Sequence, residues 1–171
     1  MNKIIQGDCL EVMKDIPDKS IDMILCDLPY GTTACKWDTI IPFEPMWEQY
    51  KRIIKDNGAI VLTASQPFTS ALVMSNPEHF KYSWIWNKKL AGNGILAKKQ
   101  PLKIHEDVLV FAYNKCPYNP QMTQGEFRKA WKSKNEGNLL GTYDNKFSTK
   151  EGTDRYPLSI QEFSNAGLRK E

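Results

Sequence analysis

Residues 21–31, Ile-Asp-Met-Ile-Leu-Cys-Asp-Leu-Pro-Tyr-Gly, constrain the fold more than any other stretch of this 171-residue chain. The run Ile21–Cys26 has the apolar composition of a strand, and it ends abruptly in an acid, a proline, an aromatic residue and a glycine. In a parallel sheet, such an ending places the carboxylate of Asp27 at the edge where ligands bind. The stretch therefore predicts an α/β protein with its site at the end of this strand.

The tetrapeptide Asp27-Leu28-Pro29-Tyr30 brings together three groups that suit a planar amine. Asp27 offers a carboxylate, and Leu28 offers a backbone carbonyl held extended because a proline follows it. Tyr30 offers a flat π surface for stacking on the heterocycle that carries the amine. Asp-x-Pro-Tyr alone is also a common strand-ending turn. With its surroundings, it predicts a site for the exocyclic amine of a flipped nucleobase.

Together with the upstream segment Gln6-Gly7-Asp8-Cys9-Leu10, the tetrapeptide resembles the catalytic motif of S-adenosylmethionine-dependent DNA amino-methyltransferases of the N6-adenine or N4-cytosine type, especially phage and prophage forms. The resemblance extends from Met1 to about Phe163. It implies a Rossmann-like methyltransferase fold, S-adenosylmethionine as cofactor and double-stranded DNA as substrate. Leu28 stands where the commoner motif has a proline. Because the expected contact is made by the carbonyl, we expect this change to cost rigidity and not chemistry.

The resemblance also implies roles for individual residues. The catalytic residues it implies are Asp27, Leu28, Pro29 and Tyr30. The cofactor contacts it implies are Asp8, Cys9, Asp27 and Gln66. Asp8 follows a predicted short strand, Lys3–Ile5, and would lie near Asp27 if the two strands are neighbours. It can equally serve as the N-cap of a helix predicted over residues 9–14, and a helix cap also explains Gln66 nearly as well.

Hydrophobic patterns, continuous apolar runs and turn residues predict the remaining elements of an incomplete Rossmann-like fold. We expect strands at 59–63, 82–88 and 105–113 and helices at 43–55 and 68–74. The Asp56-Asn57-Gly58 sequence is expected to end the first of these helices. No helix separates the last two strands, which predicts a hairpin and hence one antiparallel strand in a mostly parallel sheet.

Cationic side chains concentrate in residues 88–103, which contain five lysines and two glycines but no acid. Such a loop at the active edge is suited to clamp a phosphate backbone, although a merely solvated loop would have the same composition. Trp37 and Lys36 follow the catalytic motif and either meet DNA or belong to a solvated loop with the indole folded back. The expected DNA contacts are Gly31, Lys36, Trp37, Lys88, Lys89, Lys98, Lys99, Arg128 and Lys132.

Composition divides the chain into three parts. Residues 1–113 form the predicted catalytic α/β domain, and 114–154, rich in Pro, Gly, Asn, Lys and Ser, form a target-recognition-like insertion. Within the insertion, Arg128–Lys134 combines basic side chains with an indole, and we expect it to become ordered on DNA. Residues 155–171 form a returning strand, Arg155–Phe163, and a C-terminal tail.

Charge, cysteine content and the lack of long apolar runs bear on four other properties: nucleic-acid binding, metal binding, export and membrane insertion. The net charge of +3, from 23 basic and 20 acidic residues, permits a nucleic-acid partner without requiring one. The four cysteines form no C-x-x-C pair and there are only two histidines, so no metal site is expected and the thiols are expected to be reduced. We find neither an export signal nor a membrane-spanning run, and we expect a soluble cytoplasmic protein.

The resembled family carries a glycine-rich cofactor motif after the catalytic one, beyond a His-Pro-x-Gln-Lys-Pro-like segment, and this sequence shows neither. Gly92-Asn93-Gly94 is no substitute, because no strand ending in an acid precedes it. The chain is then a split or truncated methyltransferase completed by a second chain or by self-association, an inactive DNA-binding remnant, or a methyltransferase of a protein or RNA amine. The lysine-rich loop favours nucleic acid, and we expect adenine over cytosine as the acceptor.

Overall fold

The computed structural model describes residues 3–116, 118–132, 148–149 and 151–164. The chain forms two compact units, one of Met1–Tyr118 with Ser159–Glu171 and the other of Asn119–Leu158. In the described part of the chain, no helix is long and apolar enough to cross a membrane.

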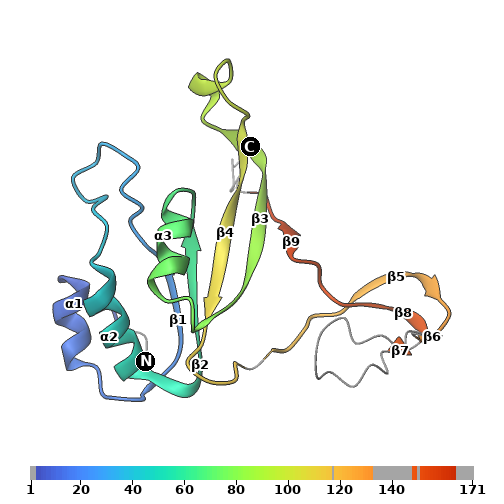
Figure 1. The fold of residues 1–171 in the computed structure, drawn as a ribbon, viewed down its shortest axis with the longest axis horizontal. Coiled ribbons are helices and arrows are strands. Elements are labelled where there is room, and N and C mark those ends of the chain that lie inside the picture. Colours follow the sequence, from blue (N-terminus) through green and yellow to red (C-terminus); the bar gives the residue numbers. More distant parts are fainter. Residues whose placement is uncertain (1–2, 117, 133–147, 150, 165–171) are drawn as a thin grey trace. The chain divides into compact units, whose positions relative to one another are not determined.

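The first unit is built on a five-stranded sheet with the order β1-β2-β4-β3-β9 (Figure 1). Its strands are β1 (Ile21–Asp27), β2 (Ile54–Ala64), β3 (Phe80–Gly92), β4 (Lys103–Phe111) and β9 (Ile160–Glu162). β1 is parallel to β2 and β9 is parallel to β3, whereas β4 is antiparallel to both of its neighbours. This confirms the predicted α/β fold with a mostly parallel sheet and one antiparallel strand.

The helices pack together against one face of this sheet (Figure 1). They are α1 (Cys9–Val12), which continues into the 3-10 turn η1 (Met13–Asp15), α2 (Phe43–Ile53) and α3 (Phe68–Ser75). Alternate residues of β2, namely Ile60, Leu62 and Ala64, are fully buried beneath them. The indole of Trp47 on α2 lies 4.9 Å, centroid to centroid, from the ring of Phe111 on β4. The core thus lies between the helices and the central strands.

The prediction of a strand at Lys3–Ile5 is wrong. This segment has no strand geometry, and its side chains Ile4 and Ile5 are 98% and 52% exposed. A strand requires a backbone partner, and in the described part of the chain β1 pairs only with β2. Apolar composition alone therefore does not make this segment a strand.

The predicted end of the second helix is also wrong. α2 ends at Ile53 and β2 begins at once at Ile54, so Asp56-Asn57-Gly58 lies inside a strand and does not stop a helix. Gly58 is needed here for close approach: a Cβ at this position would lie 2.5 Å from Ile54 Cγ1 and 2.9 Å from the backbone oxygen of Asp22. The glycine lets β2 lie against β1 near the shift in their register.

The lysine-rich segment 88–103 is less loop-like than its sequence indicates. β3 continues through Lys88 and Lys89 to Gly92, and β4 already begins at Lys103. Only a short connection remains, and it contains the 3-10 turn η2 (Gly94–Leu96). The sequence did not predict this extension of β3, because its residues show no alternation of apolar and polar side chains. The extended strand is instead stabilised by pairing with β4.

Among its described residues, the second unit contains two short antiparallel ribbons. One pairs β5 (Thr123–Arg128) with β8 (Gly152–Arg155), and the other pairs β6 (Trp131–Lys132) with β7 (Ser148–Thr149). Part of the predicted Arg128–Lys134 cluster, from residue 133 on, lies outside the described residues. The predicted returning strand 155–163 is shorter than expected, because only Ile160–Glu162 joins the main sheet.

Candidate active site

Asp27 is the last residue of β1, and Thr63 of β2 lies directly opposite it in the parallel register. The Tyr30 hydroxyl donates a hydrogen bond to Asp27 Oδ1 at 2.8 Å and lies 2.9 Å from Thr63 Oγ1. The Thr63 hydroxyl also donates to Asp27 Oδ1. The end of the strand therefore carries an exposed carboxylate held by two hydroxyl groups from different elements.

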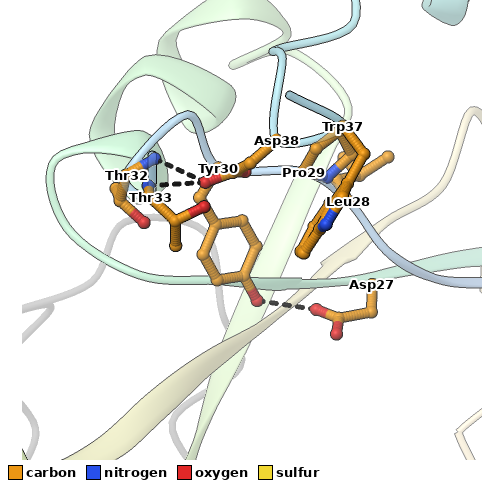
Figure 2. A pocket seen from close by; sticks show the side chains of 8 residues that line it. All are labelled: Asp27, Leu28, Pro29, Tyr30, Thr32, Thr33, Trp37 and Asp38. Atoms are coloured by element: carbon orange, nitrogen blue, oxygen red, sulfur yellow. Dashed lines mark hydrogen bonds between the residues drawn. The ribbon is translucent and has the colours of Figure 1, made fainter. Parts of the chain in front are cut away.

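A pocket of about 270 Å³ opens beside this carboxylate (Figure 2). Of the described residues, those lining it are Asp27, Leu28, Pro29, Tyr30, Thr32, Thr33, Trp37 and Asp38. All four residues predicted to be catalytic thus line one cavity. Leu28 is only 5% exposed, so its backbone is fixed by the core while the side chain of Asp27 remains accessible.

Asp38 closes the loop that follows the catalytic tetrapeptide. Its carboxylate accepts backbone N–H bonds from Gly31 at 2.8 Å, Thr32 at 2.9 Å and Thr33 at 2.7 Å. Hydrogen bonds from the Thr33 side chain and from these backbone amides lower the pKa of Asp38 to about 2. Gly31 has a φ of +67°, a conformation that glycine adopts without strain. Asp38 was not predicted from the sequence, because an acid in a polar loop gives no local sign that it accepts hydrogen bonds from amides five to seven residues away.

Tyr30 is fixed through both its ring and its hydroxyl. The ring stacks on Phe68 of α3 with centroids 5.3 Å apart and planes 25° apart. Burial is the main cause that raises the pKa of Tyr30, and the charge of Asp27 adds to it. The phenol therefore remains protonated and donates to the carboxylate. Phe68 packs against one face of the Tyr30 ring.

Thr63 was also missed, although a signal for it exists in the sequence. It ends the predicted strand 59–63, and the carboxyl ends of adjacent parallel strands meet at one edge of a sheet. A polar residue ending the strand next to that of Asp27 could therefore have been assigned to the site. The neighbour relation between the two strands could not be derived from sequence spacing alone.

Of the four residues predicted to contact the cofactor, Asp27 lines the pocket and the other three lie elsewhere. Asp8 is the N-cap of α1, and its Oδ1 accepts the Leu10 N–H at 2.8 Å. Cys9 is the exposed first residue of that helix. Gln66 follows β2, and its Oε1 accepts a hydrogen bond from the Ser70 hydroxyl at 2.8 Å. Asp8, Cys9 and Gln66 are not among the described residues that line the pocket, so their cofactor role stays a prediction.

Two of the lysines predicted to bind DNA are engaged in ion pairs. Lys88 Nζ lies 2.5 Å from Glu106 Oε1, and both side chains are largely buried, at 19% and 23% exposed. Lys89 Nζ lies 3.2 Å from Glu162 Oε2 on the adjacent strand β9. Both ammonium groups already have a carboxylate partner. A contact with a DNA phosphate would require each lysine to leave that partner.

The other predicted DNA contacts are mostly exposed. Trp37 is 74% exposed and lines the pocket, and the neighbouring Lys36 is exposed on the same loop. Lys98 and Lys99 are exposed just after η2. Arg128 is exposed at the end of β5 in the second unit, and the side chain of Lys132 lies outside the described part of the chain. Their role in DNA binding remains a prediction.

No protein-family model matches the sequence. The chain is 29% identical to the type II methyltransferase M.HinfI of Haemophilus influenzae over 52% of this chain and 32% of that protein. It is 36% identical to the type II methyltransferase M.BglII of Bacillus subtilis over 35% of this chain and 18% of that protein. The chain thus spans a third or less of the length of these curated relatives.

Among solved structures, the PvuII DNA methyltransferase, described as cytosine-N4-specific, is similar with a TM-score of 0.55. The match covers 95% of this chain and 57% of the PvuII enzyme at 11% identity, so the likeness is one of fold. Similarity in sequence to type II DNA methyltransferases, and in fold to the PvuII enzyme, confirms the resemblance to S-adenosylmethionine-dependent DNA amino-methyltransferases that Asp27-Leu28-Pro29-Tyr30 predicted.

Proposed function

We propose that this chain forms the catalytic part of a DNA methyltransferase that transfers a methyl group from S-adenosylmethionine to the exocyclic amine of a flipped base, with adenine N6 preferred. One observation carries the proposal: Asp27-Leu28-Pro29-Tyr30 ends a parallel strand and lines a pocket beside an accessible carboxylate. The setting we propose is cytoplasmic, in a restriction–modification system or a phage. Both named relatives are type II methyltransferases, which supports this setting.

The proposed chemistry depends on two acceptors for one amine. An exocyclic amine is a poor nucleophile, because its lone pair is delocalised into the ring. Hydrogen bonds from its two protons to the Asp27 carboxylate and the Leu28 carbonyl would localise that lone pair, while the Tyr30 ring stacks on the base. Positioning and electrostatics then supply most of the rate acceleration. S-adenosylmethionine, when bound, would supply the methyl group as an electrophile: its S–C bond would break as the N–C bond forms, S-adenosylhomocysteine would leave, and one amine proton would be lost to solvent.

The pocket is too small to hold both the flipped base and the whole cofactor. Its carboxylate and aromatic surfaces suit a sulfonium group and a base. However, pockets for a single drug-sized ligand range from roughly 300 to 1,000 Å³, and this one measures about 270 Å³. A base and a whole cofactor therefore require further contacts. We propose that a second chain or a second copy of this one supplies them beside β1, where Met23 and Leu25 are 51% and 68% exposed.

A calorimetric titration of the 171-residue chain with S-adenosylmethionine tests the cofactor part of the proposal. Methyl transfer is then followed with radiolabelled cofactor and unmethylated duplex DNA, with Asp27→Ala as the variant because it removes the acceptor oxygens, whereas Asn would keep one. We expect micromolar cofactor binding, label in DNA, and loss of transfer with retained DNA binding in Asp27→Ala.

Three results would contradict the proposal. Turnover in Asp27→Ala would remove the catalytic assignment, and label in RNA or protein in place of DNA would replace the substrate class. A folded chain that shifts DNA in a gel but binds no cofactor at millimolar concentration, at any protein concentration, would rule out completion by a second copy and would require a different partner chain.

A further inference from the structure

The side chains of Asp27, Tyr30 and Thr63 form a closed triangle of hydrogen bonds at the catalytic edge. Asp27 and Thr63 face each other across the β1–β2 ladder, so their separation is set by backbone pairing. Tyr30 reaches the same point from the loop after β1, and Figure 2 shows its hydroxyl joined to one of the two carboxylate oxygens. Three elements of structure thus converge on one oxygen atom.

The hydroxyl protons of Thr63 and Tyr30 determine which carboxylate oxygen of Asp27 can accept a further hydrogen bond. The Thr63 hydroxyl donates its single proton to Asp27 Oδ1, and the Tyr30 hydroxyl lies within hydrogen-bonding distance of Oδ1 and of Thr63 Oγ1. Both hydroxyl groups are therefore committed within the triangle. Within the described part of the chain, no hydrogen bond or ion pair is made to Asp27 Oδ2.

We infer that Thr63 is a positioning residue that holds the Asp27 side chain in one χ1 rotamer, so that Oδ1 is anchored and Oδ2 faces the amine of the target base. This inference rests on the proposed function and adds to it a residue outside the catalytic tetrapeptide. Thr63 does not touch the base; it acts through Asp27. The amine must meet Oδ2 and the Leu28 carbonyl at the same time, and only an Asp27 side chain held in one rotamer provides that geometry.

Thr63 is suited to this role because it is itself rigid. Its β-branched side chain restricts χ1, which keeps the hydroxyl in one direction. Its backbone is paired on both sides, with Asp27 of β1 and with Val108 of the antiparallel strand β4. Asp27, by contrast, is an exposed residue at the end of an edge strand. Thr63 on the central strand β2 is therefore held more rigidly than Asp27 on the edge strand β1, and it can restrain the Asp27 side chain.

A second threonine–aspartate pair provides a matched control. Thr69 on α3 is buried, and its hydroxyl donates to Asp107 Oδ2 on β4 at 2.7 Å. Neither residue is among the described residues that line the pocket. Thr69→Val therefore removes the same kind of hydrogen bond from the same domain without touching Asp27. If Thr63 served stability alone, the two valine variants would behave alike.

The first test compares methyl transfer by the full chain and its Thr63→Val, Thr63→Ser and Thr69→Val variants, with radiolabelled S-adenosylmethionine and unmethylated duplex DNA. We expect Thr63→Val to lower kcat about 10- to 100-fold with KM for DNA unchanged. Thr63→Ser should restore most of the rate, and Thr69→Val should lower the melting temperature but not kcat. A kcat for Thr63→Val close to that of the wild type, or an equal loss in Thr69→Val, would overturn the inference.

The second test does not depend on activity. The couplings between Hα and the two Hβ protons of Asp27, measured by NMR on the full chain, report the population of its χ1 rotamers. We expect one rotamer in the wild type, Thr63→Ser and Thr69→Val, and averaged couplings in Thr63→Val. If the wild type methylates no DNA, the proposed function fails while these couplings still decide the role of Thr63. Unchanged couplings in Thr63→Val would overturn that role.

Discussion

Asp38 shows how one side chain can hold the wall of a pocket without taking part in its chemistry. It accepts three backbone N–H groups with two oxygens, one from Gly31 on Oδ1 and two from Thr32 and Thr33 on Oδ2. An asparagine at this position keeps only one acceptor oxygen and therefore leaves at least one amide unsatisfied.

The lowered pKa of Asp38 predicts an acid dependence of stability. Its folded-state value of about 2 lies below the ordinary 3.8, so the unfolded chain binds the proton more readily. The stabilising contribution is complete above the ordinary value and is lost as the pH falls toward 2. In urea unfolding between pH 2 and 6, Asp38→Asn should be less stable than the wild type at pH 6. The difference should shrink at low pH, and parallel curves would contradict the assignment.

Tyr30 combines two functions that substitutions can separate. Tyr30→Phe keeps the ring on Phe68 and loses the hydroxyl bonds, whereas Tyr30→Ala loses both. We expect Tyr30→Ala to weaken binding of a duplex with one mismatched, readily flipped base by about 1–3 kcal/mol. Tyr30→Phe should bind like the wild type. Fluorescence anisotropy measures both affinities, and equal losses would transfer the stacking role to another residue.

The site was predictable from sequence to the extent that its residues are contiguous. Asp27-Leu28-Pro29-Tyr30 forms one side of a pocket because four adjacent residues at a strand end cannot be far apart. Thr63 and Asp38 reach the same place through strand pairing and loop closure. Such contacts depend on which strands are neighbours, and no local pattern encodes that.

At the scale of elements, β2 shows why a turn signal failed. Asn57-Gly58 has the composition of a helix stop, but the buried pair Ile53 and Ile54 carries the chain directly from α2 into the sheet. Tertiary burial overrode local propensity. The type of the long elements was nevertheless predictable, because β1 follows the apolar run Ile21–Cys26 and α2 follows the helical periodicity of its apolar residues.

Gly58 should therefore resist substitution. In Gly58→Ala the new methyl group would meet Ile54 Cγ1 and the Asp22 backbone oxygen, and we expect the free energy of unfolding to fall by about 1–3 kcal/mol. Gly94→Ala is the matched control, since a Cβ there meets no atom within 4 Å. Thermal and urea denaturation measure both, and a neutral Gly58→Ala would show that β1 and β2 separate easily.

The lysines in and near the connection between β3 and β4 differ in exposure and in ion pairing. Lys98 and Lys99 are exposed, whereas Lys88 is held by Glu106. The double substitution Lys98→Gln with Lys99→Gln should reduce the salt slope of DNA binding by about 2, because each phosphate contact contributes about 0.9. Lys88→Gln should leave that slope unchanged. Anisotropy titrations at several salt concentrations test this, and a reduced slope in Lys88→Gln alone would reverse the assignment.

At the scale of the whole molecule, the main sheet ends on one side in an edge strand with apolar side chains. Met23 and Leu25 of β1 are 51% and 68% exposed. Unpaired edges with such side chains promote association between chains. We expect sedimentation velocity to show concentration-dependent self-association that Leu25→Lys reduces. A wild type that stays monomeric at high concentration would contradict this and would favour a different chain as the partner.

The second unit leaves and rejoins the main sheet at nearby points. The Tyr118 ring lies 6.1 Å from that of Tyr82, and the Ser159 carbonyl accepts the Ile85 N–H at 2.8 Å, so both junctions are anchored on β3. A segment whose two ends are fixed close together can change in length or sequence at little entropic cost to the fold that carries it. In evolutionary terms, the part between the junctions is exchangeable, and relatives could acquire new partners while the strand ends around Asp27 remain unaltered.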